Sequence, residues 1–271
     1  MLMNPRWFDT HVHSQFSADT HTSMREQARE ALRLGLAGLA FTDHVEWYPE
    51  DETYHFLNPA DYFAELEATR AQVNGQLTLL AGLEIGNPQR FPLETAQLLE
   101  TWPWDFVLGS AHWVGHQRGW VPDFFADGAE AAYRRYFDEL LDLARHGDFD
   151  ILAHLDIVRR DDWELNRRAL PLEGFADVIR AVLRALIERG KGLEINTSGL
   201  AKGMGMPLPD RTVLRWYREL GGEILVFGSD AHSPQRLAAD FAAARELALS
   251  VGFARLARFS ARQVTGWIPL A

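Results

Sequence analysis

The sequence predicts one α/β domain over residues 1–271, folded as a TIM-like (β/α)7 barrel. Seven short apolar segments alternate with longer segments of helical pattern, which supply the crossovers that parallel strands need. Polar residues able to bind metals follow nearly every apolar segment. An open sheet would satisfy the alternation, but its outer strand ends would lie too far apart to share a site. A closed barrel brings all the strand ends together and is therefore the predicted fold.

The seven predicted strands are apolar segments that end in polar residues. In the first, Trp7, Phe8 and Val12 suit a buried strand. His11 and His13 lie two residues apart at its end and therefore project to the same side. The other segments are also continuous apolar runs, as expected of parallel strands covered on both faces. In chain order, the strands are predicted at 7–13, 35–44, 77–86, 105–112, 149–154, 191–199 and 223–232.

Capping residues mark the predicted helices. Thr22 or Ser23 can cap the first helix and Gly35 can end it. Asp127 can cap a long helix, and Ser260 can cap a short one that closes the chain. In chain order, helices are predicted at about 22–35, 58–74, 93–99, 127–147 and 173–190, from 209 and from 233 onward, and after 260, with a basic turn at 158–160.

Composition excludes several classes of function. The formal net charge of −11 argues against a nucleic-acid or anionic-membrane partner, because both need a basic surface. The absence of cysteine excludes disulfides and thiolate metal sites, so any metal is held by nitrogen and oxygen. No apolar run approaches a membrane span, and the N-terminus lacks the apolar region of a signal peptide. We expect a soluble cytoplasmic enzyme, whose oligomeric state the sequence leaves open.

Six histidines and three carboxylates stand at or near the predicted strand ends. A single histidine in such a place is usually a hydrogen-bonded neighbour. Packing the whole set without cations would bring three carboxylates together and leave imidazoles unpaired, at a high cost in free energy. We therefore predict a site for zinc, iron or manganese. Its candidate ligands are His11, His13, Asp19, His44, Glu84, His112, His154, Asp230 and His232.

The motifs around these residues resemble the polymerase and histidinol phosphatase (PHP) superfamily, in order and spacing, over the whole chain. Within it, the length and the segment I-N-T-S-G-L at 195–200 resemble the monofunctional histidinol-phosphatases of histidine biosynthesis. The resemblance implies a distorted (β/α)7 barrel with three divalent metal ions that hydrolyses L-histidinol phosphate to L-histidinol and phosphate. The motifs are H-V-H at 11–13, T-D-H at 42–44, G-L-E at 82–84, S-A-H at 110–112, A-H at 153–154 and S-D-A-H at 229–232.

The resemblance also implies how the ligands are shared, with Glu84 bridging two metals and Glu84, Asp230 and His232 as catalytic residues. A hydroxide bridging two metals would attack phosphorus, because metal binding lowers the pKa of water by several units. Asp43 is expected to orient a ligand from behind. The implied sets are His11, His13, Glu84 and Asp230 for one metal, Glu84, His112 and His154 for the second, and Asp19, His44 and His232 for the third.

Phosphate also needs cationic help beyond the metals. The candidate phosphate-binding residues are Arg159 and Arg160, which follow His154 closely, Ser198 at the end of the sixth predicted strand, and Lys202 just after that strand. For each of the three basic side chains, the alternative is an exposed surface charge. Lys202 departs from the arginine often found near this position in the family, and a lysine offers a point charge without the guanidinium fork.

The acidic and aromatic segment 46–56 leaves a strand end that bears a ligand. It could recognise the substrate, with Glu46 or Glu50 meeting an amino group and Trp47 or Tyr48 stacking on an imidazole. The alternative is a lid packed on the barrel rim. The sequence does not choose between these two roles.

Other functions remain as alternatives. The same metals could act on another small phosphomonoester, a nucleotide or phosphotyrosine. A nuclease is disfavoured by the acidic net charge. An amidohydrolase is disfavoured because no predicted strand end carries the lysine that such sites use. A non-enzymatic metal-binding module would show no metal-dependent phosphatase activity.

Overall fold

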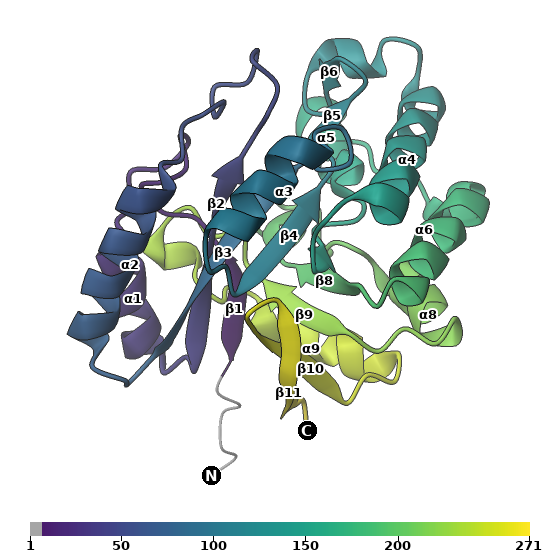
Figure 1. Ribbon diagram of the computed structural model, residues 1–271. Helices are drawn as coiled ribbons and strands as arrows, with labels where there is room; N and C mark the ends of the chain where they lie inside the picture. Colours follow the sequence, from purple (N-terminus) through teal and green to yellow (C-terminus); the bar gives the residue numbers. More distant parts are fainter. Residues whose placement is uncertain (1–6) are drawn as a thin grey trace.

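Seven parallel strands form a nearly closed barrel in the computed structural model, which describes residues 7–271 (Figure 1). Each strand pairs with the next barrel strand along the chain, and β1 meets the segment just after β9 through an isolated parallel bridge between Val12 and Ala231. The predicted (β/α)7 barrel is confirmed. Its strands are β1 Phe8–Val12, β2 Gly38–Val45, β3 Thr78–Gly86, β4 Phe106–Ser110, β7 Ile151–Leu152, β8 Gly192–Asn196 and β9 Leu225–Gly228.

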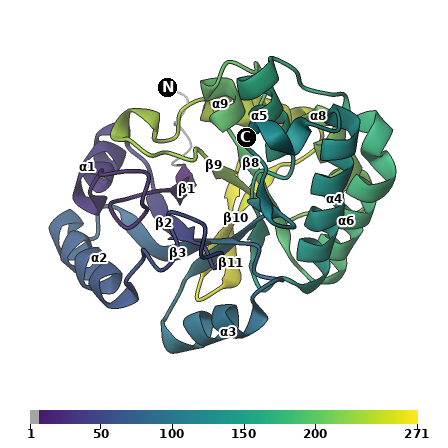
Figure 2. The same cartoon turned by 90° about the horizontal axis from the view of Figure 1, so that it is seen from above.

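Helices surround the barrel, as the view from above shows (Figure 2). Ser23 caps α1 in a capping box with Glu26, and Gly35 ends this helix with φ 72°. Asn58 caps α2 by accepting a hydrogen bond from the backbone N–H of Ala60. Within residues 7–271, no helix has both the length and the apolar character needed to cross a bilayer. The helices are α1 Met24–Leu34, α2 Pro59–Val73, α3 Pro92–Thr101, α4 Ala129–His146, α5 Ile157–Asn166, α6 Ala176–Glu188, α7 Ser198–Ala201, α8 Arg211–Glu219 and α9 Phe241–Ser250, with 3-10 helices η1 Pro122–Phe125, η2 Leu172–Phe175 and η3 Pro234–Arg236.

Three local predictions from the sequence are wrong. Residues 158–160 belong to α5 and are not a turn, because Ile157 and Val158 bury an apolar face and start a helix. The N-cap of α4 is Gly128, and the side chain of Asp127 does not cap it. The segment after Ser233 begins with only the short helix η3, and the long helix α9 starts at Phe241.

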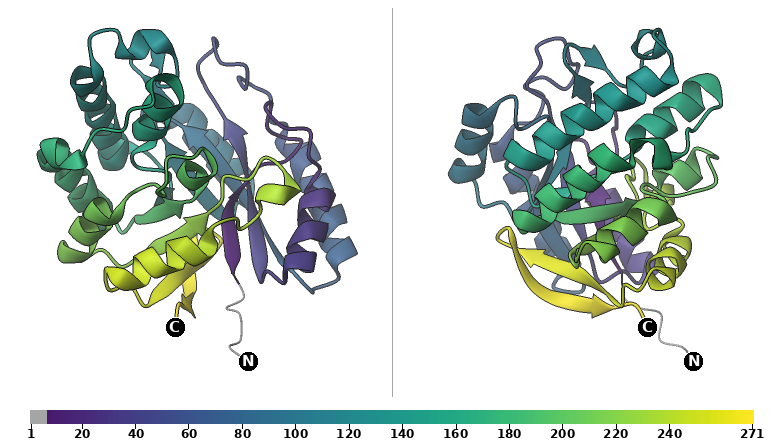
Figure 3. Two further views of the ribbon diagram at one scale, coloured as in Figure 1. Left: turned by 180° about the vertical axis from the view of Figure 1, so that it is seen from behind. Right: turned by 90° about the vertical axis from the view of Figure 1, so that its right-hand side faces the viewer.

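The end of the chain is a β-hairpin, so the predicted helix after Ser260 is also wrong. Strands β10 Arg255–Ser260 and β11 Gln263–Pro269 pair in antiparallel fashion around Ala261 and Arg262, which have φ 46° and 61°. The side chain of Arg262 pairs with Asp148 and Asp150, just before β7, at 2.6 and 3.1 Å. These ion pairs hold the hairpin under the amino-terminal end of the barrel (Figure 3). A second short hairpin, β5 Trp113–Val114 and β6 Gln117–Arg118, follows β4.

The interior of the barrel changes from apolar to polar along the strands. Alternate residues of a strand share a face, so Leu80 and Glu84 both point inward from β3, as Ala40 and His44 do from β2. The lower layer is closed by the C-terminal hairpin, and the upper layer carries the polar residues at the carboxyl ends. The lower layer is formed by Phe8, Ala40, Leu80, Phe106, Leu108, Ile151, Ala153, Val226, Ala257 and Phe259.

Candidate metal centre

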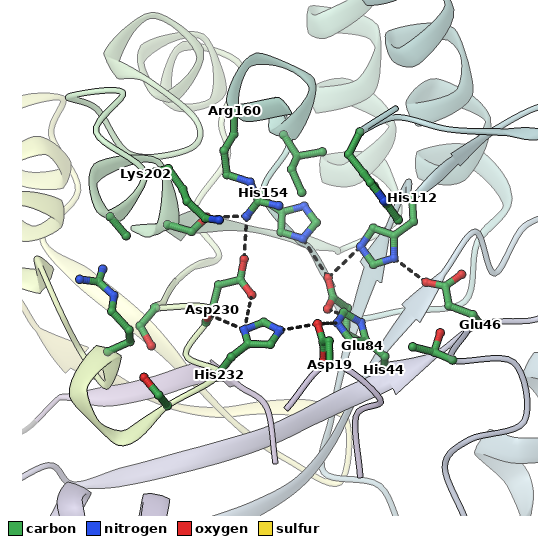
Figure 4. A pocket seen from close by; sticks show the side chains of 18 of the residues that line it. Asp19, His44, Glu46, Glu84, His112, His154, Arg160, Lys202, Asp230 and His232 are labelled. Carbon is green, nitrogen blue, oxygen red and sulfur yellow. Dashed lines mark hydrogen bonds and ion pairs between the residues drawn. The ribbon is translucent and has the colours of Figure 1, made fainter. Parts of the chain in front are cut away.

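All nine candidate ligands meet at the carboxyl end of the barrel, where Figure 4 shows most of them. His11, His44 and Glu84 lie within the ends of β1, β2 and β3. The other six lie in the segments that follow the strands. Because parallel strands in a closed barrel all end on the same side, residues more than 200 positions apart become neighbours.

Glu84 is the centre of the cluster and is 1% exposed. Its Oε2 lies 3.2 Å from His11 Nε2 and 3.0 Å from His44 Nδ1. Its Oε1 lies 3.3 Å from His112 Nε2 and 2.8 Å from His154 Nε2, and also accepts a hydrogen bond from the Ser110 hydroxyl at 2.6 Å. The two oxygens therefore face different groups of histidines, as a carboxylate that bridges two cations would.

Asp230 and Asp19 complete the cluster. Asp230 Oδ1 lies 3.3 Å from His13 Nε2 and 3.7 Å from His11 Nε2. Asp19 Oδ2 lies 2.9 Å from His232 Nε2 and 3.5 Å from His44 Nε2. Asp19, which lies in a loop outside the family motifs, is thus beside the two histidines with which the family resemblance groups it.

Buried ligand atoms without hydrogen bonds show that the site fits cations. Among residues 7–271, His11 Nε2, His13 Nε2, His44 Nδ1 and Glu84 Oε2 are inaccessible to solvent and form no hydrogen bond. Leaving one such group without a hydrogen bond costs about 1–3 kcal/mol, so four of them around one point are energetically unfavourable unless a cation binds there. Imidazole nitrogen and carboxylate oxygen are also the donors that zinc, iron and manganese accept.

The protonation states of Glu84 and His13 suit metal binding. Burial raises the pKa of Glu84, but the charges of His11, His44 and His112 outweigh it and hold that pKa well below its usual range. Burial lowers the pKa of His13 to about 3, helped by His232 and His44. Glu84 is therefore ionised and His13 neutral at pH 7, the forms in which both bind metals.

Two buried carboxylates stand behind the histidines: Glu194, which the sequence-based prediction did not name, and Glu46, to which it gave a different role. Glu194 in β8 is fully buried, and its Oε1 lies 2.7 Å from His11 Nδ1. Glu46 is 3% exposed, and its Oε1 lies 2.5 Å from His112 Nδ1. Each carboxylate can accept a hydrogen bond from Nδ1 of its histidine, so Nε2 is the nitrogen that is directed at Glu84 and becomes available to a metal when it loses its proton.

Spacing could have identified both residues. Glu46 lies two positions after His44, and Glu194 lies two positions before Asn196, so each shares a face with a residue of the strand end. Two strand glycines make room for them. A side chain at Gly86 would meet the carboxylate of Glu46, and a side chain at Gly228 would meet that of Glu194.

Asp43 acts through a serine and touches no candidate ligand directly. Its Oδ1 accepts hydrogen bonds from the Ser14 backbone N–H at 2.6 Å and the Ser17 hydroxyl at 2.7 Å. The Ser17 oxygen lies 3.1 Å from His13 Nδ1 and can accept its proton. This relay orients His13 in the same way as Glu194 orients His11.

The candidate phosphate-binding residues separate into two groups. Arg160 donates hydrogen bonds to Ser198 Oγ at 2.8 Å and Asp230 Oδ2 at 2.9 Å, and these residues line a cavity of about 590 Å³ together with Lys202. Arg159 is 4% exposed, does not line this cavity, and pairs with Asp156 and Asp210. Its position removes Arg159 from the candidates for phosphate binding.

The segment 46–56 borders the same cavity, and Glu46 is the only one of its suggested recognition residues that lines it. Asp51, Glu52 and Thr53 line it together with Glu46, whereas Glu50 does not. Tyr48 stacks on Trp113 with ring centroids 4.6 Å apart, so it packs the segment onto the rim. The segment therefore contains both rim-packing residues and cavity-lining residues.

Comparison with known proteins gives a family match to most of the chain and matches of relatives over at least 90% of it. The family profile of the PHP domain matches residues 9–198. The histidinol-phosphatase of Lactococcus lactis subsp. lactis (strain IL1403) is 29% identical over 94% of this chain and 95% of its own. A probable histidinol-phosphatase of Deinococcus radiodurans is 30% identical, with 90% and 93% coverage. The crystal structure of the L. lactis histidinol phosphate phosphatase, complexed with zinc, L-histidinol and phosphate, matches with a TM-score of 0.85 and 28% identity over 96% of this chain and 99% of that one.

Proposed function

The chain belongs to the PHP domain family, and from this premise we propose that it is a metal-dependent phosphatase that hydrolyses L-histidinol phosphate to L-histidinol and phosphate. The observation that carries the proposal is the Glu84-centred cluster, whose unpaired buried donors fit divalent cations. Relatives named histidinol-phosphatase match over nine tenths of the chain. The reaction belongs to histidine biosynthesis, so we propose the cytoplasm as its location.

We propose three divalent metal ions in the cluster. His11, His13, Glu84 and Asp230 would hold the first, Glu84, His112 and His154 the second, and Asp19, His44 and His232 the third. The distances around the two oxygens of Glu84 support its role as the shared ligand. The grouping of His11, His13 and Asp230 around one point supports the first set.

When bound, such ions supply Lewis acidity, which activates water for attack on phosphorus and neutralises charge on the phosphate oxygens. The side chains supply positions and protonation states. Glu84 and Asp230 stay ionised because histidines surround them, and Asp230 also fixes the guanidinium of Arg160. His232 Nδ1 can donate to the backbone oxygen of Asp230 at 3.0 Å, so Nε2, which lies 2.9 Å from Asp19 Oδ2, is the nitrogen on the side of the proposed third metal.

Arg160 is the proposed phosphate-binding residue. Its Nη1 is fixed by Ser198 and Asp230, while its Nε is buried and has no hydrogen-bond partner among residues 7–271. A guanidinium held at the cavity wall can contact a phosphate oxygen without first being ordered. Lys202 would add a second positive charge, although its Nζ already lies 2.9 Å from Glu164.

The test is steady-state hydrolysis of L-histidinol phosphate on metal-analysed protein, set against other small phosphomonoesters, nucleotides and a phosphotyrosine peptide. We expect kcat/KM for L-histidinol phosphate to be well above the rest. Comparable low rates on all of them would keep the phosphoesterase and reject this substrate. Activity on none of them, with metal bound, would leave a metal-binding module.

A further inference from the structure

The cavity above the metal centre has basic side chains on one wall. Arg160, Lys202 and Arg236 all line it. Figure 4 shows Arg160 and Lys202 on the side of Asp230, whereas Glu46 lies on the other side of the cluster, beyond His112. A phosphate ester bound with its phosphoryl group near Arg160 could therefore direct its alcohol toward the wall that contains Glu46.

Acidic side chains also line the cavity, namely Glu46, Asp51 and Glu52. Glu46 lies beyond His112, and Asp51 is hydrogen-bonded to Trp113, the residue after His112, so we call this side the acidic wall. Oε2 of Glu46 is buried and has no hydrogen-bond partner among residues 7–271. The carboxylate of Glu52 is exposed and forms no ion pair with any of these described residues. Both carboxylate oxygens of Asp51, in contrast, accept hydrogen bonds. Since Glu46 also pairs with His112, Glu52 is the acidic residue of this wall with no hydrogen bond or ion pair from its carboxylate in the part of the chain that the structure describes.

The backbone around Glu52 is fixed, although its side chain is exposed. Asp51 Oδ1 accepts hydrogen bonds from the backbone N–H and the hydroxyl of Thr53, at 2.9 and 2.8 Å. Asp51 Oδ2 accepts another from Trp113 Nε1 at 3.0 Å. One residue before, the carbonyl of Glu50 accepts from Arg118 at 3.0 Å. Glu52 is therefore presented to the cavity from an anchored turn.

We propose that Glu52 binds the ammonium group of the alcohol part of the substrate, so that the cavity selects phosphomonoesters whose alcohol carries a cationic amine. The separation of charge in the cavity matches such a substrate, with an anionic phosphate at one end and a cation at the other. This inference rests on the proposed function, because L-histidinol phosphate has this pattern. The ribose ester of a nucleotide and the phenol ester of phosphotyrosine carry no ammonium beside the ester.

The test compares two substrates on the metal-loaded enzyme. One is L-histidinol phosphate, and the other is 3-(imidazol-4-yl)propyl phosphate, which lacks only the amino group. The variant is Glu52→Gln, and the matched control is Glu50→Gln, an exposed carboxylate of the same segment that does not line the cavity. The measured quantity is the kcat/KM for L-histidinol phosphate divided by the kcat/KM for the analogue without the amino group. A general loss of activity cancels in this ratio.

We expect Glu52→Gln to lower this ratio about tenfold, as for one charge-assisted contact, and Glu50→Gln to leave it unchanged. The inhibition constant of L-histidinol should rise in Glu52→Gln by a similar factor, whereas that of 3-(imidazol-4-yl)propanol should rise less. A wild-type preference for L-histidinol phosphate that survives in Glu52→Gln overturns this inference alone. A wild-type preference for nucleotides or phosphotyrosine overturns the proposed function together with it.

Discussion

Replacing Glu194 by glutamine tests how the centre keeps its histidines ready for metal. In the native protein Glu194 accepts three hydrogen bonds, from His11 Nδ1 at 2.7 Å, the His154 backbone N–H at 2.8 Å and Asn196 Nδ2 at 3.2 Å. A glutamine side chain has nearly the same shape, but one of its two ends is a donor. Whichever way the amide lies, that donor faces His11 or the N–H of His154.

If the NH2 group of the glutamine faces His11, two donors would meet at Nδ1, so the imidazole proton of His11 must move from Nδ1 to Nε2. Nε2 is the nitrogen that lies 3.2 Å from Glu84 Oε2. His11 then lacks the free electron pair that a metal needs. Loss of such an outer hydrogen bond typically costs 10- to 100-fold in metal affinity. This corresponds to about 1.4–2.7 kcal/mol, since tenfold is 1.36 kcal/mol.

The affinity is measured by competition with a chelator of known metal affinity, and the melting temperature of the metal-free protein serves as the check of folding. Glu188→Gln, at an exposed position on α6, is the matched control and should not change the affinity. An unchanged metal affinity in a folded Glu194→Gln protein would refute the role of Glu194 in orienting His11.

Four further outcomes are expected. Glu84→Gln should abolish hydrolysis and lower the metal content, because it removes the bridging charge; an active, metal-replete variant would contradict the cluster. Arg160→Ala should lower kcat/KM by an amount equivalent to about 1.5–3 kcal/mol. Arg159→Ala should leave the kinetics of the folded protein intact, but should reduce the free energy of unfolding in urea by about 3–5 kcal/mol. Chelation should stop hydrolysis and lower the melting temperature, since bound metal stabilises only the folded state; an unchanged melting temperature would argue against a bound metal. Arg262→Ala should destabilise the protein by about 1–3 kcal/mol at pH 7. Burial raises the pKa of Asp148, but Arg262 outweighs burial and lowers that pKa. The stabilisation should therefore be lost as acid protonates the carboxylate. A difference in free energy of unfolding between the variant and the native protein that stays constant down to about pH 3 would contradict the pairing.

The sequence by itself determined the barrel and the ligand types. Apolar runs that end in histidine or a carboxylate mark the strands, because residue type and strand period are local properties of the chain. The family motifs, which the PHP match confirmed, added the expected activity. The predicted helix after Ser260 failed because the hairpin is held by Arg262, whose partners Asp148 and Asp150 lie more than 100 residues earlier.

Only the tertiary structure decided which side chains support the candidate ligands and which line the cavity. Arg159 and Arg160 are neighbours in sequence, but successive residues of a helix point about 100° apart, so one meets Asp210 and the other Asp230. Glu194 and His11 are 183 residues apart, and nothing in either local segment pairs them. Their contact exists because barrel closure makes inward-facing side chains of distant strands neighbours, a relation that depends on the whole sheet.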